Sequence, residues 1–138
     1  MIILDTNVVS ELMRRQPDSS VVRWLDQQAT QSIWITTITL FETRLGLALL
    51  PVGPRREGMK QAFAQMLAQD LENRVLPFDT EAASQAALLA AEWQRGGRPV
   101  DMRDTQIAGI AQARRARLAT RNLHHFEGLT VEVINPWA

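Results

Sequence analysis

The sequence has no cysteine among its 138 residues. Disulfides, zinc–thiolate sites and cysteine nucleophiles are therefore excluded. No apolar run approaches the roughly 18 residues that cross a bilayer, and Met1–Asp5 carries no basic residue ahead of its apolar stretch. We therefore expect neither a transmembrane segment nor a signal peptide, and we expect a soluble cytoplasmic protein.

Lysine is nearly absent, and the chain has no net charge. Lys60 is the only lysine among fifteen basic residues, so the other fourteen are arginine. Residues 65–92 carry five acids and one arginine, a charge of −4, whereas residues 93–121 carry seven arginines and two aspartates, a charge of +5. Zero net charge argues against a nucleic-acid partner. A guanidinium nevertheless binds phosphate through two donors, so the arginine-rich segment suits a phosphodiester.

Short apolar segments alternate with amphipathic segments along the whole chain. Strands are predicted at residues 2–4, 32–37, 74–78, 117–120 and 130–134. Helices are predicted from Asp5, from Asp18 and from about Thr39, and at residues 59–67, 82–93 and 104–115. This alternation predicts a single α/β domain, residues 1–138, with a parallel sheet.

The helix predicted from Thr39 carries Phe41, Leu45, Ala48 and Leu49 on one face. Apolar residues at this spacing are typical of a helix that packs against a core. Thr39 and Glu42 also have the spacing of a capping box, which would give Glu42 a structural role at the start of the helix.

Three acids and an asparagine lie next to predicted strands. Asp5 ends the first strand, Glu42 lies early in the helix after the second, Asp104 opens the helix before residues 117–120, and Asn122 follows that strand. In a parallel sheet these side chains point toward the same edge, where ligands bind. Oxygen ligands of this kind suit Mg²⁺ or Mn²⁺. Each residue also has a structural interpretation, because acids cap helices and asparagine is frequent in turns.

Five segments resemble the PIN-domain proteins, and among them the VapC toxins of bacterial toxin–antitoxin pairs. They are Met1–Asn7, Thr39–Gly46, Asp104–Ala108, Leu118–Asn122 and Val133–Trp137, and the last resembles the FitB-like branch. The segments occur in order and span nearly the whole chain. The resemblance implies an α/β/α sandwich around a parallel sheet of four or five strands.

The resemblance also implies a metal-dependent endoribonuclease, with Asp5, Glu42 and Asp104 as the catalytic residues and metal ligands and with Mg²⁺ or Mn²⁺ as the cofactor. Thr6 would support the site through its hydroxyl, and Thr120 would lie at the rim of the pocket. The expected partners are an RNA substrate, a cognate antitoxin and a second copy of the chain, with DNA contacted only through the antitoxin.

For the helices at 59–71 and 82–93, core packing is the main interpretation, and a self-association face or an antitoxin groove is the alternative.

One position departs from the family pattern. Many members carry a fourth acid where this chain has Asn122, which offers an oxygen to a metal but no charge. Asp101 is the candidate substitute, although it competes with Asp104 for the role of helix cap.

Arginines and histidines near these acids invite further roles. Arg121 and Arg103 are the candidates for binding RNA phosphates, a contact that positions the strand and carries little sequence information. His124 and His125 suggest a general base, but adjacent side chains diverge, so we interpret them as exposed loop residues.

Two alternative functions remain open. A binding or scaffold protein with the same fold would fit Asn122 and the zero net charge, although three clustered acids repel one another unless an ion lies between them. A haloacid-dehalogenase-like phosphatase also has an aspartate after its first strand. It requires a second acid at position 7, which is Asn7, and a late lysine, and Lys60 is the only lysine.

Overall fold

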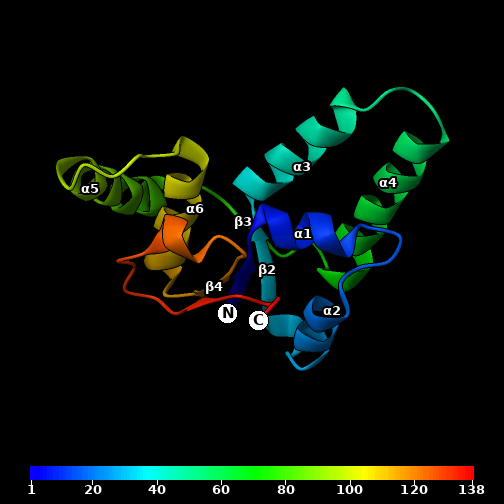
Figure 1. The fold of residues 1–138 in the computed structure, drawn as a ribbon, viewed down its shortest axis with the longest axis horizontal. Helices are drawn as coiled ribbons and strands as arrows, with labels where there is room; N and C mark the ends of the chain where they lie inside the picture. Colours follow the sequence, from blue (N-terminus) through cyan, green and yellow to red (C-terminus); the bar gives the residue numbers. More distant parts are fainter.

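The computed structural model describes residues 1–138 and contains one parallel sheet of five strands (Figure 1). The strand order is β3-β2-β1-β4-β5, so the first strand lies at the centre. The strands are β1 (Ile2–Leu4), β2 (Ile33–Thr36), β3 (Val75–Leu76), β4 (Arg117–Ala119) and β5 (Val133–Ile134). The predicted α/β class and parallel sheet are confirmed.

Six helices cover the sheet and three short helical turns connect them. The helices are α1 (Thr6–Leu12), α2 (Ser19–Asp26), α3 (Thr37–Leu49), α4 (Pro54–Gln65), α5 (Thr80–Arg95) and α6 (Met102–Arg114). The short turns are η1 (Thr30–Ser32), η2 (Met66–Asp70) and η3 (Leu123–Phe126). None of these helices combines the length and the apolar character needed to cross a membrane.

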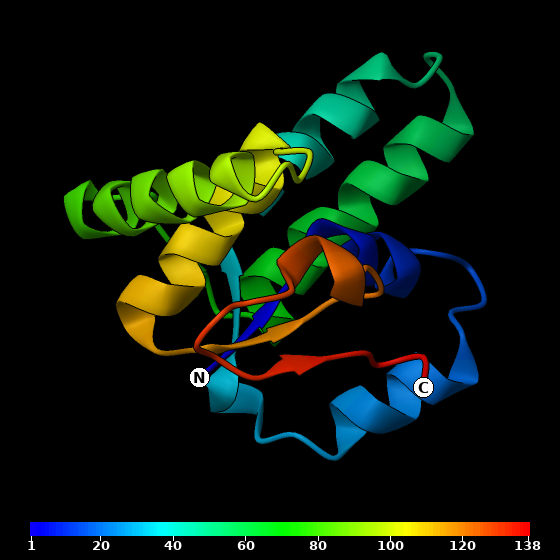
Figure 2. The same ribbon diagram turned by 60° about the vertical axis from the view of Figure 1, so that its left-hand side comes forward.

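Alternation along β1 divides the core into two layers, because successive side chains of a strand point to opposite faces. Ile2 and Leu4 pack with residues from α1 to α4 on one face. Ile3 packs with residues from α5, α6 and η3 on the other face. Figure 2 shows α5 and α6 on one side of the sheet and α2 on the other. The arrangement is the predicted three-layer sandwich.

Helix starts follow the capping residues in the sequence. The carboxylates of Asp5, Asp18 and Asp79 accept hydrogen bonds from the first turns of α1, α2 and α5. Asp101 caps α6 by accepting a bond from the backbone N–H of Asp104 at 3.0 Å. The interpretation of Asp104 as the cap is therefore wrong, and its carboxylate is free for other contacts.

The prediction for α3 is wrong in two respects. The helix begins at Thr37, and the hydroxyl of Thr36, not a Thr39–Glu42 capping box, accepts the bond from the N–H of Thr39. The buried residues of the helix are Thr39, Thr43 and Leu47. Phe41 is 57% exposed and Leu49 is 76% exposed, so the apolar face expected in the core lies on the surface.

The other differences concern element ends. The strands expected at 32–37, 74–78 and 130–134 are shorter, and the helix expected at 59–67 begins at Pro54 and continues into η2. Proline is favoured in the first turn of a helix, which explains the earlier start. On α5 the buried residues are Ala82, Ala86, Leu89 and Trp93, so the core-packing interpretation of this helix is confirmed.

Helices α5 and α6 approach closely at Gly109. A Cβ atom at this position would lie 2.6 Å from the carbonyl oxygen of Ala82 and 2.7 Å from the Cβ of Ala86. Backbone atoms cannot yield as a flexible side chain does, so the contact requires glycine at this position.

We predict that Gly109→Ala destabilises the fold, because the added methyl forces α5 away from α6. Overpacking of this kind costs about 2 kcal/mol. Gly46→Ala is the matched control, since Gly46 is also inside a helix but a Cβ there would contact nothing. The control should gain about 0.5–1 kcal/mol from helix propensity. Urea unfolding of both variants tests this, and an unchanged stability of Gly109→Ala would contradict it.

Candidate active site

Asp5 lies at the carboxyl end of the central strand, and it is only 4% exposed. Its backbone N–H donates to the carbonyl of Ala119, which fixes it beside β4. One carboxylate oxygen accepts from the backbone N–H of Thr6 at 2.8 Å, and the other accepts from the hydroxyl of Thr120 at 2.7 Å. The carboxylate thus joins the end of β1, the start of α1 and the residue after β4.

Asn7 belongs to this cluster, which no pattern in the sequence indicates. Its amide nitrogen lies 3.2 Å from Oδ2 of Asp5 and 3.3 Å from the hydroxyl of Thr120. The side-chain oxygen of Asn7 accepts a hydrogen bond from the backbone N–H of Arg121. The expectation for Thr120 also needs correction, because this residue is fully buried and does not lie at a pocket rim.

Glu42 enters the site from the first half of α3. One oxygen accepts from the hydroxyl of Thr6 at 2.8 Å, and that hydroxyl lies 3.0 Å from the hydroxyl of Thr39. The other oxygen pairs with the guanidinium of Arg103 at 3.3 Å. Arg103 thus bridges α6 and α3, and in this structure it neutralises an acid of the site.

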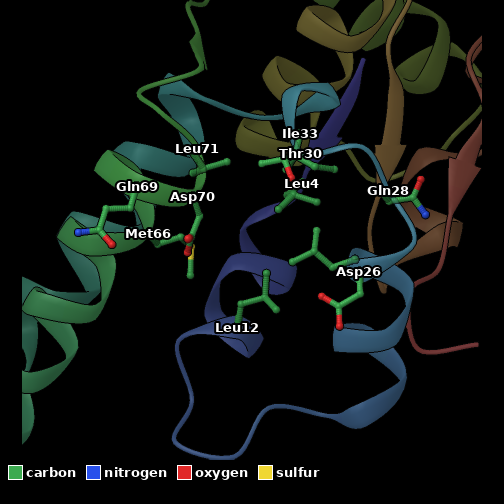
Figure 3. A pocket seen from close by; sticks show the side chains of 11 residues that line it. Leu4, Leu12, Asp26, Gln28, Thr30, Ile33, Met66, Gln69, Asp70 and Leu71 are labelled. Carbon is green, nitrogen blue, oxygen red and sulfur yellow. The ribbon is translucent and has the colours of Figure 1, made fainter.

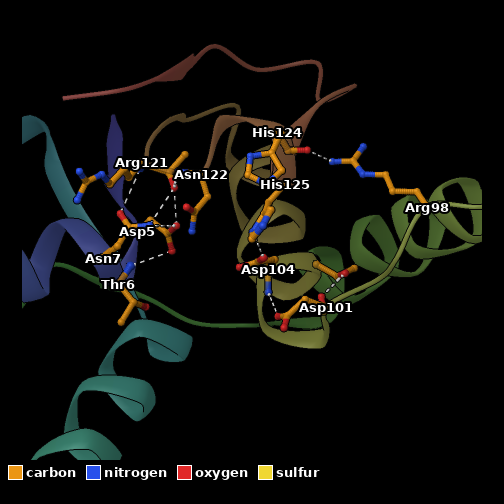
Figure 4. Close-up of polar contacts among 12 residues, drawn as sticks. Asp5, Thr6, Asn7, Arg98, Asp101, Asp104, Arg121, Asn122, His124 and His125 are labelled. Atoms are coloured by element: carbon orange, nitrogen blue, oxygen red, sulfur yellow. Dashed lines mark hydrogen bonds and ion pairs between the residues drawn. The ribbon is translucent and has the colours of Figure 1, made fainter. Parts of the chain in front are cut away.

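Asp104 comes from the first turn of α6, and its carboxylate contacts a histidine. Nδ1 of His125 lies 2.9 Å from Oδ2 of Asp104 (Figure 4). His124 and His125 are exposed, as expected, but their rings do not diverge, because the centroids are 4.3 Å apart with a 75° angle between the planes. His125 therefore contacts an acid of the site, and the interpretation of this residue as only an exposed loop histidine is wrong.

Charge repulsion connects the three acids. Burial raises the pKa of the Asp5 carboxyl from 3.8 to about 6; bonds from Thr120 and Thr6 oppose this, and the charges of Asp104 and Glu42 add to it. Burial also raises the pKa of Asp104, with the charges of Asp101 and Glu42 acting in the same direction and His125 opposing them. The site therefore holds excess negative charge that its own donors offset only in part.

This donor set suits a hard divalent cation in one specific way. No group of three or more acidic or histidine side chains is spaced to share a single ion directly. Mg²⁺ usually keeps several waters and binds one or two carboxylates. Buried Asp5 and half-buried Asp104, which repel each other, fit such a hydrated ion.

The two remaining candidates lie after β4. The backbone N–H of Asn122 donates to the hydroxyl of Thr120, and Figure 4 places its side chain beside Asp5. Arg121 is exposed, and its guanidinium lies 4.9 Å from the ring centre of Trp137. Arg121 therefore has its cationic group at the surface near the site.

A separate groove of about 460 Å³ lies between α1, α2 and η2 (Figure 3). Apolar side chains such as Leu12, Met66 and Leu71 line it, together with the acids Asp26 and Asp70. None of Asp5, Glu42 and Asp104 reaches this groove, so it is not part of the acidic site.

Comparisons with known proteins agree with this architecture. The family model for the PIN domain matches residues 2–128. Plasmid stability protein StbB of Pseudomonas syringae pv. tomato is 42% identical over 137 residues, covering 99% of this chain and 99% of that protein. VapC ribonuclease Y4jK of Sinorhizobium fredii is 39% identical over 99% of this chain and 98% of that protein.

Among solved structures, FitAB bound to an IR36 DNA fragment has a chain that superposes with a TM-score of 0.91. It is 36% identical in sequence, and the match covers 100% of this chain and 96% of that chain. The parallel sheet with acids at its carboxyl edge is therefore a PIN fold. The chain belongs to the PIN-domain family, in the group that contains the VapC and FitB toxins.

We predict that Asp5→Asn stabilises the metal-free protein, and increasingly so as the pH rises from 4 to 7. The pKa of Asp5 is raised in the folded state, so the folded protein retains a proton that the unfolded chain releases, and stability falls as pH rises through this window. Asparagine removes this loss, which reaches about 3 kcal/mol above pH 6.

Urea unfolding in chelator at pH 4 and pH 7 measures the effect. Asp18→Asn is the matched control, because it makes the same exchange at an exposed helix cap. A stabilisation by Asp5→Asn that is equal at both pH values would show that burial of the charge is not its cause.

Proposed function

We propose that the chain is a metal-dependent endoribonuclease that acts as the toxin of a toxin–antitoxin pair. The observation that carries the proposal is the set of three mutually repelling carboxylates at the carboxyl edge of the sheet. Ribonuclease activity is in the name of the relative Y4jK, and the relative FitB is named a toxin. The expected substrate is RNA, and the expected cofactor is Mg²⁺ or Mn²⁺.

In this proposal Asp5 and Asp104 would hold the ion, and Asn122 would add a neutral oxygen. A bound ion would activate water and stabilise the charge of the attacked phosphodiester. Glu42 would bind the ion through a water molecule or orient the attacking water, with its position fixed by the hydroxyl of Thr6. Thr120 and Asn7 keep the Asp5 carboxylate in one orientation.

Arginines near the site would bind the RNA backbone. Arg121 is an exposed residue beside the carboxyl end of β4, and its guanidinium lies over the ring of Trp137 without an ion pair, so a phosphate could pair with it. Arg103 is paired with Glu42, so it would have to exchange this contact for a phosphate. We therefore expect Arg121 to contribute more to RNA affinity than Arg103.

Partner binding has two surfaces available. The apolar groove of Figure 3, with its acids Asp26 and Asp70, suits an amphipathic segment of the antitoxin that carries basic residues. DNA would then be contacted only through the antitoxin. The exposed apolar face of α3, including Phe41, Leu49 and the following Val52, suits a second copy of the chain, because monomers rarely expose such patches.

The non-catalytic scaffold stays as the second candidate, since the Arg103–Glu42 ion pair and neutral Asn122 reduce the charge available for a metal. The haloacid-dehalogenase-like phosphatase is excluded, because the chain belongs to the PIN-domain family. Cleavage of RNA separates the two candidates that remain.

We predict that the antitoxin-free protein cuts end-labelled RNA in Mg²⁺ or Mn²⁺ and not in chelator. Asp5→Asn should reduce the rate at least about 100-fold, more than the loss of a residue that supports a ligand, and Thr120→Val about 10–100-fold. Asp18→Asn, far from the acidic site, should keep the activity. If well-folded protein cuts no RNA under any condition, the scaffold function replaces this proposal.

We predict a dimer in sedimentation experiments at micromolar concentration. Leu49→Glu places a charge in the exposed α3 face and should shift the protein to a monomer. Leu88→Glu, at a 67% exposed leucine on α5, is the matched control and should leave the dimer intact. A wild-type monomer, or a dimer that tolerates Leu49→Glu, would contradict the assigned interface.

A further inference from the structure

A hollow of about 480 Å³ adjoins Asp104 but is not lined by Asp5 or Glu42. Eight residues line it: Trp93, Arg98, Pro99, Val100, Asp101, Asp104, His124 and His125. Of these only Asp104 takes part in the proposed reaction. The hollow is therefore a neighbouring chamber that opens beside the acidic site.

One wall of the chamber is formed by two imidazole rings. The rings of His124 and His125 meet edge to face, with 4.3 Å between their centroids. Both side chains remain exposed, so their outer surfaces are open to a ligand. Flat rings of this kind bind unpaired bases of single-stranded RNA by stacking.

Contacts to the backbone and to Asp104 hold this wall in place. Arg98 donates to the carbonyl of Glu127 at 2.6 Å and to the carbonyl of His124 at 2.9 Å. Its guanidinium also lies 4.3 Å from the ring centre of Trp93. The bond between His125 and Asp104 fixes the second ring. These contacts occupy the guanidinium of Arg98. The residue therefore holds this wall in place and has few donors left to bind a phosphate.

The charge of the chamber favours a base over a phosphate. Asp101 and Asp104 both face it, and carboxylates repel a phosphate group. Oδ1 of Asp101 accepts the cap bond from Asp104, which leaves Oδ2 as an acceptor without a protein partner. Carboxylates accept hydrogen bonds from amino groups on base edges, as they do from the amino group of cytosine.

We propose that this chamber binds an unpaired nucleobase next to the scissile phosphate, and that it prefers a base with an amino group. The inference rests on the proposed ribonuclease function only for the nature of the ligand. The base stacks on the ring of His124, since the planes of the two imidazoles stand at 75° and one base can be parallel to only one of them. Its amino group donates to Asp101. The chamber thereby supplies base selectivity that the acidic site and the arginines do not.

Binding of short RNAs to the Asp5→Asn protein tests the proposal without cleavage. Fluorescein-labelled hexamers of adenosine, cytidine and uridine are titrated in Mg²⁺ and followed by anisotropy. Cytidine and uridine stack similarly but only cytidine has an amino group, so hexacytidine should bind several-fold tighter than hexauridine. Equal affinity for the two pyrimidine hexamers would overturn the assigned role of Asp101.

Two further variants in the same background separate the contacts. Asp101→Asn keeps a residue that caps helices well but replaces the free acceptor by a donor, so it should abolish or reverse the preference for cytidine. His124→Ala should lower the affinity for all three hexamers roughly tenfold, because a ring on which a base stacks is lost. His124→Phe, which keeps a ring, should restore the affinity.

The outcomes for the chamber and for the ribonuclease are distinguishable. RNA cleavage by the wild type together with unselective binding that His124→Ala leaves unchanged would overturn the chamber and leave the nuclease intact. Selective binding that depends on His124 and Asp101, without any cleavage, would support the chamber and overturn the nuclease.

Discussion

The carboxylate of Asp5 is the point at which the three parts of the site are joined. It lies buried at the end of the central strand, and it accepts from the first N–H of α1 and from the hydroxyl that follows β4. Burying a charge destabilises a fold unless hydrogen bonds or opposite charges offset it. Here the donors are all neutral, and the pKa of the group stays raised at about 6. The fold therefore tolerates a carboxylate that its own contacts leave incompletely stabilised.

The other two acids are also partly buried, and each has a partner that is charged or can become charged. Glu42 pairs with Arg103 from α6, and Asp104 contacts His125 from η3. Both contacts cross between elements, so they brace α3, α6 and η3 around Asp5. With these partners the three acids lie at one edge of the sheet, although the three are not spaced to hold one ion directly. A cation bound at Asp5 would supply the positively charged partner that this carboxylate does not have among its neighbours.

Much of the fold follows from local signals in the sequence. The caps at Asp5 and Asp18, the positions of the five strands along the chain and the inward face of α5 depend on residues close together in the chain, and the structure confirms them. The missed contacts join distant segments: Asn7 meets Thr120, and His125 meets Asp104 across η3 and α6. Spacing along one helix or strand carries no information about such pairs. The roles of Asp5, Glu42 and Asp104 in holding a metal stay predictions, although the structure brings these residues to one edge.

The orientation of α3 shows how the site limits what local patterns can predict. Burial of Thr39 and Thr43 turns the hydroxyls of α3 inward, where Thr39 contacts Thr6, while Phe41 and Leu49 face solvent. The hydroxyl of Thr43 is buried without a partner, which is unfavourable in itself. A helix that only had to stabilise a monomer would gain by rotating its apolar face inward. Its actual rotation is the one that brings Glu42 to Thr6, so the geometry of the site takes precedence over burial. The apolar face left outside then gains stability only when another chain covers it, which links the acidic site to the proposed dimer through a single helix.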